Sequence, residues 1–142
     1  MEISYKQIEN ELQLSSVLDM CYRILGQKYR SNEFYSYDKW IERLKNNEIM
    51  VFAEYEGYPI SAVLGRTENE ESIIIGFVAC DEKFRMKGIT KKLMKLFEEK
   101  ATKSGYKYIT LGAQEDACGF YEKCNYHVSK RIDGQKIYQK NL

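Results

Sequence analysis

The sequence predicts an α+β fold with a central β-sheet, mixed but mostly antiparallel, that is flanked by helices. Three observations support this prediction. Residues 72–80 are apolar on both alternating faces, an amphipathic helix pattern follows at 88–103, and two pairs of short strand-like segments are each joined by turn residues. The predicted order is β-α-α-β-β-β-α-β-α-β-β, and no repeat or linker interrupts it, so residues 1–142 are expected to form a single domain.

The first part of the chain is expected to hold one strand and two helices. Residues 2–6 alternate weakly and could form the first strand, and apolar residues recur at helical spacing over about 9–27. Ser36 can cap a second helix, which has an apolar face around Trp40 and ends near 46–47.

A hairpin and a buried strand are predicted next. Residues 49–56 and 60–66 have strand patterns, and the residues between them favour a turn in which Pro59, the only proline, is expected. Residues 72–80 are apolar on both faces, which predicts a strand in the middle of the sheet with both faces covered.

The C-terminal half begins with the most regular helix pattern in the chain. Apolar residues from Ile89 to Phe97 form one stripe after Gly88, and Ser104 with Gly105 supplies the stop. The shorter elements that follow are a strand at 108–111, a helix at 117–123, and strands at 126–131 and 135–140 around Asp133 and Gly134.

Composition and charge narrow the class of protein. The formal net charge is +1, and acidic and basic residues are interleaved along almost every segment, so the chain lacks the basic stripe of a duplex-binding protein. The N-terminus has no basic start followed by an apolar run, and no stretch approaches the roughly 20 apolar residues that span a bilayer. Neither nucleic acid nor a membrane is an expected partner, and a cytoplasmic location is expected.

The cysteines and the histidine do not predict a metal site. The four cysteines show no CxxC pair and are expected to be reduced thiols. His127 is the only histidine, which rules out multi-histidine sites, and it is expected to be a half-buried strand residue. No metal is therefore expected.

The junction between the buried strand and the long helix has the features of a phosphate site. The first turn of a helix has unpaired backbone N–H groups and lies at the positive end of the helix dipole. Gly88 allows a ligand to approach the backbone, and Arg85 and Lys87 place two positive charges just before the helix. Two adjacent phosphates would suit this arrangement.

Two motifs in this order resemble the GNAT superfamily of N-acetyltransferases. The family's loop has Arg or Gln, two residues, Gly, one residue, and Gly or Ala; the corresponding residues here are Arg85, Met86, Lys87, Gly88, Ile89 and Thr90. The family's AxxFYEKxGF motif is matched by Ala117, Phe120, Tyr121, Glu122 and Lys123, with Asn125 and Tyr126 where Gly and Phe are usual. Either motif alone is weak, but together in the right elements they are much more specific.

The resemblance implies a GNAT-like fold and direct transfer of an acetyl group from acetyl-CoA to a primary amine of a small molecule or protein, within a ternary complex. It implies that backbone groups of Phe77, Val78, Ala79 and Cys80 bind the pantetheine arm, and that the pyrophosphate lies on Arg85, Met86, Lys87, Gly88, Ile89, Thr90 and Lys91, with Gln114 also on the cofactor. Tyr121 would donate a proton to the leaving thiolate. The same residues also suit a purely structural role, Phe77, Val78 and Cys80 as core strand residues and Tyr121 as a core tyrosine.

Three positions depart from the family pattern. Thr90 stands where the family prefers Gly or Ala, Glu82 where a proline is common, and Gln114 where asparagine is frequent. Thr90 could crowd the pyrophosphate or donate its hydroxyl to it, and it keeps open the alternative of a non-catalytic GNAT-like sensor or interaction module that binds CoA. An enzyme of another class that binds a different nucleotide is a further alternative, disfavoured because GxxxxGK[ST] and GxGxxG are absent.

The acceptor side has weaker signals. No general base is assigned, although Glu54, Glu68, Glu70 and Glu71 are candidates by analogy with the family. The family builds its acceptor wall from the connector between the first two helices, where this chain has Tyr29, Arg30, Asn32, Glu33, Phe34, Tyr35 and Tyr37. An aromatic and acidic wall would suit a cationic amine, and an aromatic-rich surface could support a homodimer.

Overall fold

A computed structural model describes all residues, 1–142, and contains one seven-stranded sheet in the order β1-β2-β3-β4-β5-β7-β6. The strands are β1 (Ser4–Gln7), β2 (Met50–Tyr55), β3 (Tyr58–Thr67), β4 (Ser72–Cys80), β5 (Tyr108–Ala113), β6 (His127–Ile132) and β7 (Gln135–Asn141). The helices are α1 (Glu11–Leu25), α2 (Tyr37–Lys45), α3 (Ile89–Lys103) and α4 (Cys118–Lys123), with short 3-10 helices η1 (Gln27–Ser31), η2 (Glu82–Phe84) and η3 (Glu115–Ala117). Only β4 and β5 pair in parallel. The predicted α+β class and the order of strands and α-helices are confirmed.

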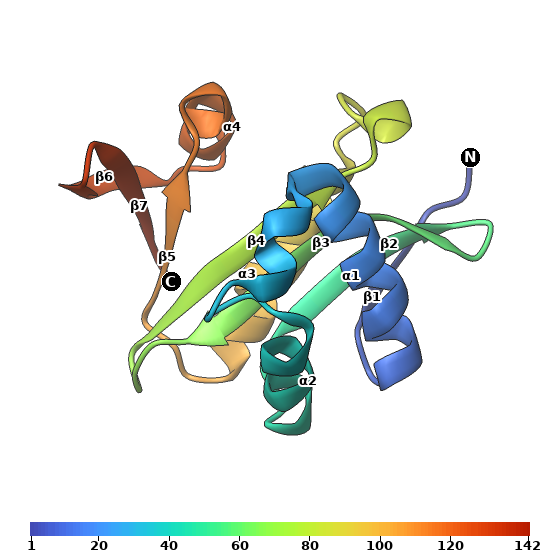
Figure 1. Cartoon of the computed structure of the whole chain (residues 1–142). Helices are drawn as coiled ribbons and strands as arrows, with labels where there is room; N and C mark the ends of the chain where they lie inside the picture. Colours follow the sequence, from blue (N-terminus) through green and yellow to red (C-terminus); the bar gives the residue numbers. More distant parts are fainter.

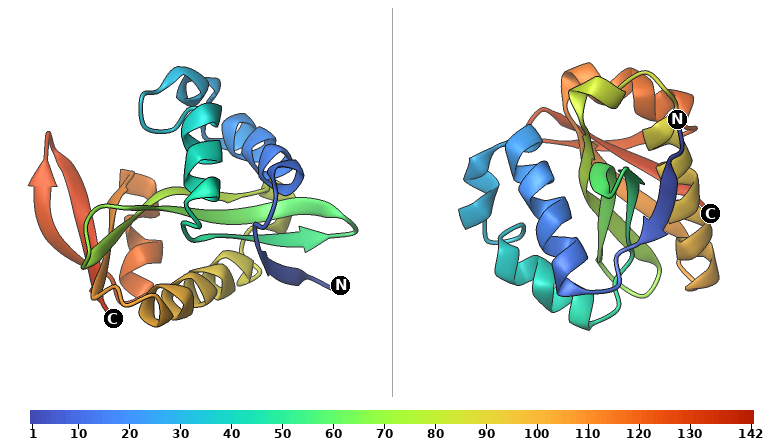
Figure 2. Two further views of the ribbon diagram at one scale, coloured as in Figure 1. Left: turned by 90° about the horizontal axis from the view of Figure 1, so that it is seen from below. Right: turned by 90° about the vertical axis from the view of Figure 1, so that its right-hand side faces the viewer.

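Helices cover the sheet on both faces (Figure 2). The helices α1 and α2 lie on one face, and α3 and α4 lie on the other. Each face has its own apolar core: Leu14, Leu18 and Trp40 pack in the first, and Leu93 and Phe97 in the second. None of the helices is long and apolar enough to cross a bilayer.

The turn between β2 and β3 is shorter than the sequence predicted. Glu56 and Gly57 alone form the turn, with φ of 51° and 82°, which suits a tight hairpin. Pro59 therefore lies inside β3 opposite Glu54, next to an irregularity in the pairing at Ala53 and Glu54. A proline is tolerated at such an irregularity, because the missing N–H does not interrupt a regular ladder.

The strand β4 is central, as predicted, and it carries a bulge. Leu64 of β3 pairs with Phe77 and Gly65 pairs with Ile75, so Gly76 is an extra residue on β4. A Cβ at Gly76 would lie 2.6 Å from Cε1 of Tyr35, which means that only glycine allows this ring to pack directly on the strand. The bulge lies where β4 begins to separate from β5.

The last hairpin extends the sheet beyond β5. The sequence predicted its turn at Asp133 and Gly134, which have φ of 48° and 81°. Because β7 lies next to β5, β6 is the edge strand, and all of its residues are exposed. His127 is therefore exposed at the start of β6, and the prediction that it is half-buried was wrong.

Candidate active site

The two central strands β4 and β5 pair over a short stretch and then diverge. Parallel pairing joins Ser72–Ile74 to Tyr108–Thr110, whereas β4 continues to Cys80 and β5 to Ala113. Figure 1 shows the two strands separating, with α4 beyond the end of β5 and the loop to α3 beyond the end of β4. This gap leaves one edge of β4 without a neighbouring strand.

Alternate residues of β4 present their backbone to the gap. The N–H of Asp81 donates to the C=O of Ile60 at 2.8 Å, across the β3 side. Because successive residues of a strand direct their N–H and C=O groups to opposite edges, Ala79 faces β3, whereas Val78 and Cys80 face the gap. An extended ligand with amide groups could pair with this edge as an added strand would.

The four predicted cofactor-binding residues of β4 thus divide into two pairs. Phe77 and Ala79 turn their backbone groups toward β3, and their side chains pack against α1 and α2. Val78 and Cys80 keep a free backbone edge, although Nε of Arg85 donates to the C=O of Cys80 at 3.3 Å.

The loop before α3 presents a row of free backbone donors. Gly88 caps the helix with φ of 77°, and no side chain caps the first turn. None of the N–H groups of residues 86–91 donates to a protein acceptor. Met86 also has a positive φ, 63°, and its side chain is fully exposed. Free donors at the positive end of a helix dipole bind anions.

The positive charges around this loop are not neutralised by the protein. Arg85 and Lys87 are exposed just before the helix, and Lys91 is exposed in its first turn. None of the three takes part in an ion pair, and the first turn of α3 contains no acidic residue. The loop is therefore electrostatically suited to a polyanion.

Thr90, the residue that departs from the family loop, faces the sheet with its hydroxyl. Its Oγ1 lies 2.9 Å from Oγ of Ser61, and that hydroxyl donates to the C=O of Ala79 at 2.8 Å. Ser61 has one hydroxyl hydrogen, which it gives to Ala79, so Thr90 is the donor of the first bond. The hydroxyl of Thr90 is therefore used within the protein and ties the first turn of α3 to β3.

Tyr121 lies on α4 with its ring buried and its hydroxyl unpaired. The residue is 7% exposed, and the rings of Phe120, Tyr126 and Tyr138 lie 5.3 to 6.2 Å from its own. No protein group bonds to its hydroxyl, which is not fully buried. Burial, with smaller contributions from Cys124 and Cys118, raises the pKa of Tyr121 to about 12. The phenol therefore keeps its proton and is free to donate it to a ligand.

Hydrogen bonds hold the surroundings of α4 in place. The hydroxyl of Tyr126 donates to Glu98 at 2.8 Å, and Nζ of Lys140 lies 3.0 Å from the other oxygen of Glu98. The hydroxyl of Tyr138 donates to Glu122 at 2.7 Å. These tyrosines are structural, which leaves Tyr121 as the one with a free hydroxyl in this cluster.

Gln114 lies at the end of the gap on the side of β5. Its C=O accepts from the N–H of Ala117 at 2.9 Å, and its side chain is exposed between β5 and α4. The side chain makes no hydrogen bond to another protein group.

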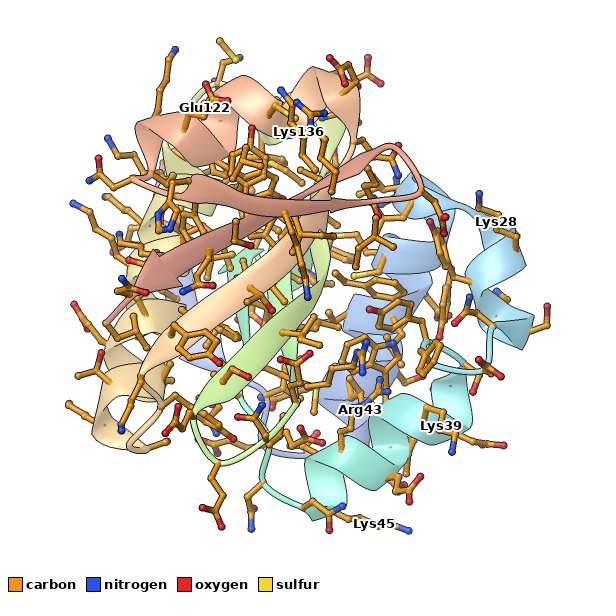
Figure 3. The ribbon with its side chains drawn as sticks, turned by 90° about the vertical axis from the view of Figure 1, so that its left-hand side faces the viewer. Lys28, Lys39, Arg43, Lys45, Glu122 and Lys136 are labelled. Atoms are coloured by element: carbon orange, nitrogen blue, oxygen red, sulfur yellow. The ribbon has the colours of Figure 1, made fainter.

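The connector between α1 and α2 does bring its aromatic residues together. Tyr29, Tyr35 and Trp40 surround Phe77 of β4, with ring centroids 5.1 to 5.6 Å from it, and Phe34 packs on Tyr35. Figure 3 views the molecule from the side of β6 and β7, with η1 at the right of the sheet and α2 below it.

The charge of this wall differs from the expected one. Glu33 is exposed at the surface, and two arginines stack on the aromatic rings instead: Arg66 from β3 and Arg43 from α2. The expectation of an acidic wall was wrong, because the charged side chains that pack on the rings are arginines. The sequence could not reveal this, since the two arginines come from elements far apart in the chain. Neither arginine carries a local sequence signal that could have placed it there.

The carboxylates considered as general bases are engaged elsewhere or exposed. Glu54 pairs with Lys6 at 2.8 Å, and Glu71 pairs with Lys107 at 3.3 Å. Glu68 accepts from the hydroxyl of Ser72 at 2.8 Å. Glu70 is exposed in the turn before β4. The structure gives no reason to select one of them.

Comparisons with known proteins agree with this architecture. The model of the acetyltransferase (GNAT) family matches residues 13–126. Among solved structures, the PaiA N-acetyltransferase from Thermoplasma acidophilum in complex with coenzyme A is similar with a TM-score of 0.82 at 16% identity, covering 100% of both chains. A GNAT acetyltransferase from Elizabethkingia anophelis with acetyl-CoA bound has a TM-score of 0.73 at 17% identity, covering 99% of this chain and 98% of that one. An aminoglycoside 6'-N-acetyltransferase complexed with coenzyme A has a TM-score of 0.78 at 16% identity, covering 99% and 97%.

At these identities the solved structures establish the fold alone, whereas the family model covers most of the chain and contains both sequence motifs. The match disfavours the alternative of an unrelated nucleotide-binding enzyme. The chain therefore belongs to the GNAT acetyltransferase family.

Proposed function

We propose that the protein is an N-acetyltransferase that transfers an acetyl group directly from acetyl-CoA to a primary amine in a ternary complex. One observation carries the proposal, and it is the position of the free edge of β4. This edge runs from the unpaired N–H groups at the start of α3 to the gap between β4 and β5. The helix α4, which carries the unpaired hydroxyl of Tyr121, borders that gap. The similar proteins that were solved with acetyl-CoA or coenzyme A make the same ligand the natural candidate for this chain.

Each end of the site has a role in this proposal. The N–H groups of residues 86–91, with Arg85 and Lys87, would hold the pyrophosphate. The backbone of Val78 and Cys80 would pair with the amides of the pantetheine arm. These contacts would place the thioester near the bulge at Gly76, where a backbone N–H can polarise its carbonyl.

Acetyl transfer then needs one proton donor on the protein. The lone pair of the neutral amine forms the new N–C bond while the C–S bond breaks, and the sulfur leaves as a thiolate. The hydroxyl of Tyr121 donates to that thiolate, and the proton lost by the amine passes to water, from which Tyr121 is reprotonated. Burial raises the pKa of Tyr121 to about 12, so the hydroxyl is protonated throughout the neutral range and can donate to the sulfur as its negative charge develops.

The test combines turnover with a matched pair of variants. Acetyl-CoA and a panel of primary amines are incubated with the protein, thiol release is followed, and products are identified by mass spectrometry. Tyr121→Phe should lower kcat about 100-fold and leave the Kd for coenzyme A within about threefold. Tyr138→Phe is the control: its ring centroid lies 6.1 Å from that of Tyr121 and its hydroxyl is engaged with Glu122, so the variant should lower stability and spare kcat.

The same measurements test the alternative of a non-catalytic module. Binding of coenzyme A without acetylation of any amine in the panel or in a cell extract would favour a sensor over an enzyme. Equal kcat in the wild type and Tyr121→Phe would remove the role given to Tyr121.

A further inference from the structure

Two arginines pack on one cluster of aromatic rings, near the point where β4 and β5 are still paired. Cζ of Arg66 lies 5.0 Å from the ring of Phe34 and 5.6 Å from that of Tyr35, and its Nε donates to the Tyr35 hydroxyl at 3.4 Å. Cζ of Arg43 lies 5.8 Å from the same Tyr35 ring and 4.6 Å from the ring of Trp40. Both guanidinium groups therefore approach one tyrosine.

No acidic side chain forms an ion pair with either arginine. The nearest carboxylates serve other groups, since Glu48 accepts from the N–H of Thr67 and Glu42 lies 3.8 Å from Lys39. Burial, and then the charge of Arg66, lowers the pKa of Arg43.

The cluster also contains two buried donors that lack a hydrogen-bond partner, Nη1 of Arg43 and Nε1 of Trp40. Unpaired buried donors are rare in proteins, and an unpaired buried charge is costly. Stacking on aromatic rings explains where the two guanidinium groups lie, but it does not explain why two like charges that form no ion pair are held together.

The position of the cluster relates it to the proposed chemistry. Arg66 pairs with Ile74, and Ile74 pairs with Thr110 in the last parallel step before β4 and β5 diverge. The ring of Tyr35 packs on Gly76, the bulged residue of β4, which lies two positions after Ile74. A group bound to Arg66 would thus lie beside the point at which the thioester is expected. Figure 3 shows Arg43 reaching from α2 toward this side of the sheet.

We propose that Arg66 and Arg43 bind an oxyanion on the acceptor, so that the substrate is an amine that also carries a carboxylate or a phosphate. The inference rests on the proposed function and specifies its substrate class. A guanidinium group binds a planar carboxylate or a phosphate through two parallel hydrogen bonds, which also fixes the orientation of the bound molecule. The amine of such a substrate would be aimed into the gap. Arg66 makes the direct contact, and the more deeply buried Arg43 adds positive potential.

The test uses pairs of amines that differ only in the anion. An α-amino acid is compared with its carboxamide, and an aminoalkyl phosphate with the corresponding amino alcohol. The anionic member of at least one pair should have a kcat/KM at least 10-fold higher, and the pair that shows the preference separates a carboxylate from a phosphate. Arg66→Gln should raise KM for that anionic amine about 10- to 100-fold and leave the neutral partner unchanged.

Two further variants control for packing. Arg66→Lys keeps the charge without the planar fork and should recover part of the affinity. Arg131→Gln removes an exposed arginine on the edge strand β6, away from the aromatic wall. It should leave the preference between anionic and neutral amines unchanged.

Binding measured by calorimetry separates this inference from the proposed function. Binding of an anionic amine to the coenzyme A complex that Arg66→Gln abolishes, without turnover, would support the anion site and contradict the enzyme. Turnover of neutral and anionic amines with equal kcat/KM, or an equal loss for both in Arg66→Gln, would overturn the anion site and leave the enzyme standing. Failure of both anionic amines to bind or react would also overturn it.

Discussion

Thr90 offers the sharpest test of how the loop before α3 is built, because its hydroxyl has a single assigned partner. Thr90→Val keeps the branched shape and removes only the donor to Ser61. A net hydrogen bond of this kind contributes about 1 kcal/mol. Ser61 keeps its own bond to the C=O of Ala79, so no buried donor is left unpaired. The free energy of unfolding should fall by about 1 kcal/mol, or about 3 °C in Tm for a chain of this size.

The affinity for coenzyme A should hardly change in the same variant. Since the hydroxyl of Thr90 is turned to the sheet, its loss removes no donor from the row of N–H groups at residues 86–91, and Kd should stay within about threefold. Urea unfolding and calorimetric titration measure the two quantities separately. A double-mutant cycle with Ser61→Ala should give a coupling free energy of about 1 kcal/mol. A Kd weakened more than tenfold at unchanged stability, or a coupling near zero, would show that the hydroxyl serves the ligand instead of Ser61.

Three further predictions concern glycine positions and alkaline pH. Gly88→Ala and Gly105→Ala both place a Cβ in open space at positive φ, 77° and 90°, so each should lower the free energy of unfolding by about 1 kcal/mol. Only Gly88→Ala should also weaken the Kd for coenzyme A, by about tenfold. Equal Kd values in the two variants would contradict the placement of the ligand. Gly65→Ala would bring a Cβ within 2.5 Å of Cζ of buried Phe97 and should lower the free energy of unfolding by about 1 to 3 kcal/mol. An unchanged free energy in urea unfolding would show that Phe97 can move aside without cost. Because the folded-state pKa of Tyr121 is raised to about 12, its contribution to stability is intact below pH 10 and is lost as the pH rises toward 12. At pH 11 the wild type should therefore have lost about 1 kcal/mol of unfolding free energy relative to Tyr121→Phe. Parallel curves of stability against pH for the two proteins would contradict this.

The donor side of the site could be predicted from the sequence because it is local. Arg85, Lys87, Gly88 and the first turn of α3 are neighbours in the chain, and the geometry of a helix start follows from that short segment alone. What the sequence left open there was the direction of one side chain, Thr90. The sequence allowed this side chain either to crowd the pyrophosphate or to donate its hydroxyl to it, whereas the structure pairs the hydroxyl with Ser61 on β3.

The acceptor side could not be predicted in the same way. Its aromatic residues were recognised from the connector, but the charge of the wall depends on Arg43 of α2 and Arg66 of β3, which β2 separates in the chain. An arginine near the end of an apolar strand or within a short amphipathic helix is usually a solvated residue. Arg43 and Arg66 become neighbours only because α2, β3 and the connector pack together around Tyr35.

The bulge at Gly76 is the structural reason for this arrangement. Ile73 and Ile75 face α3, and strict alternation would send Phe77 and Ala79 to the same face. The extra residue reverses the alternation, so Phe77 and Ala79 face α1 and α2 instead. Since every position of β4 is apolar or small, the sequence pattern could not reveal the reversal. The reversal places Phe77 under the aromatic wall and directs the backbone of Val78 into the gap, so one inserted glycine positions both the acceptor wall and the free edge of β4.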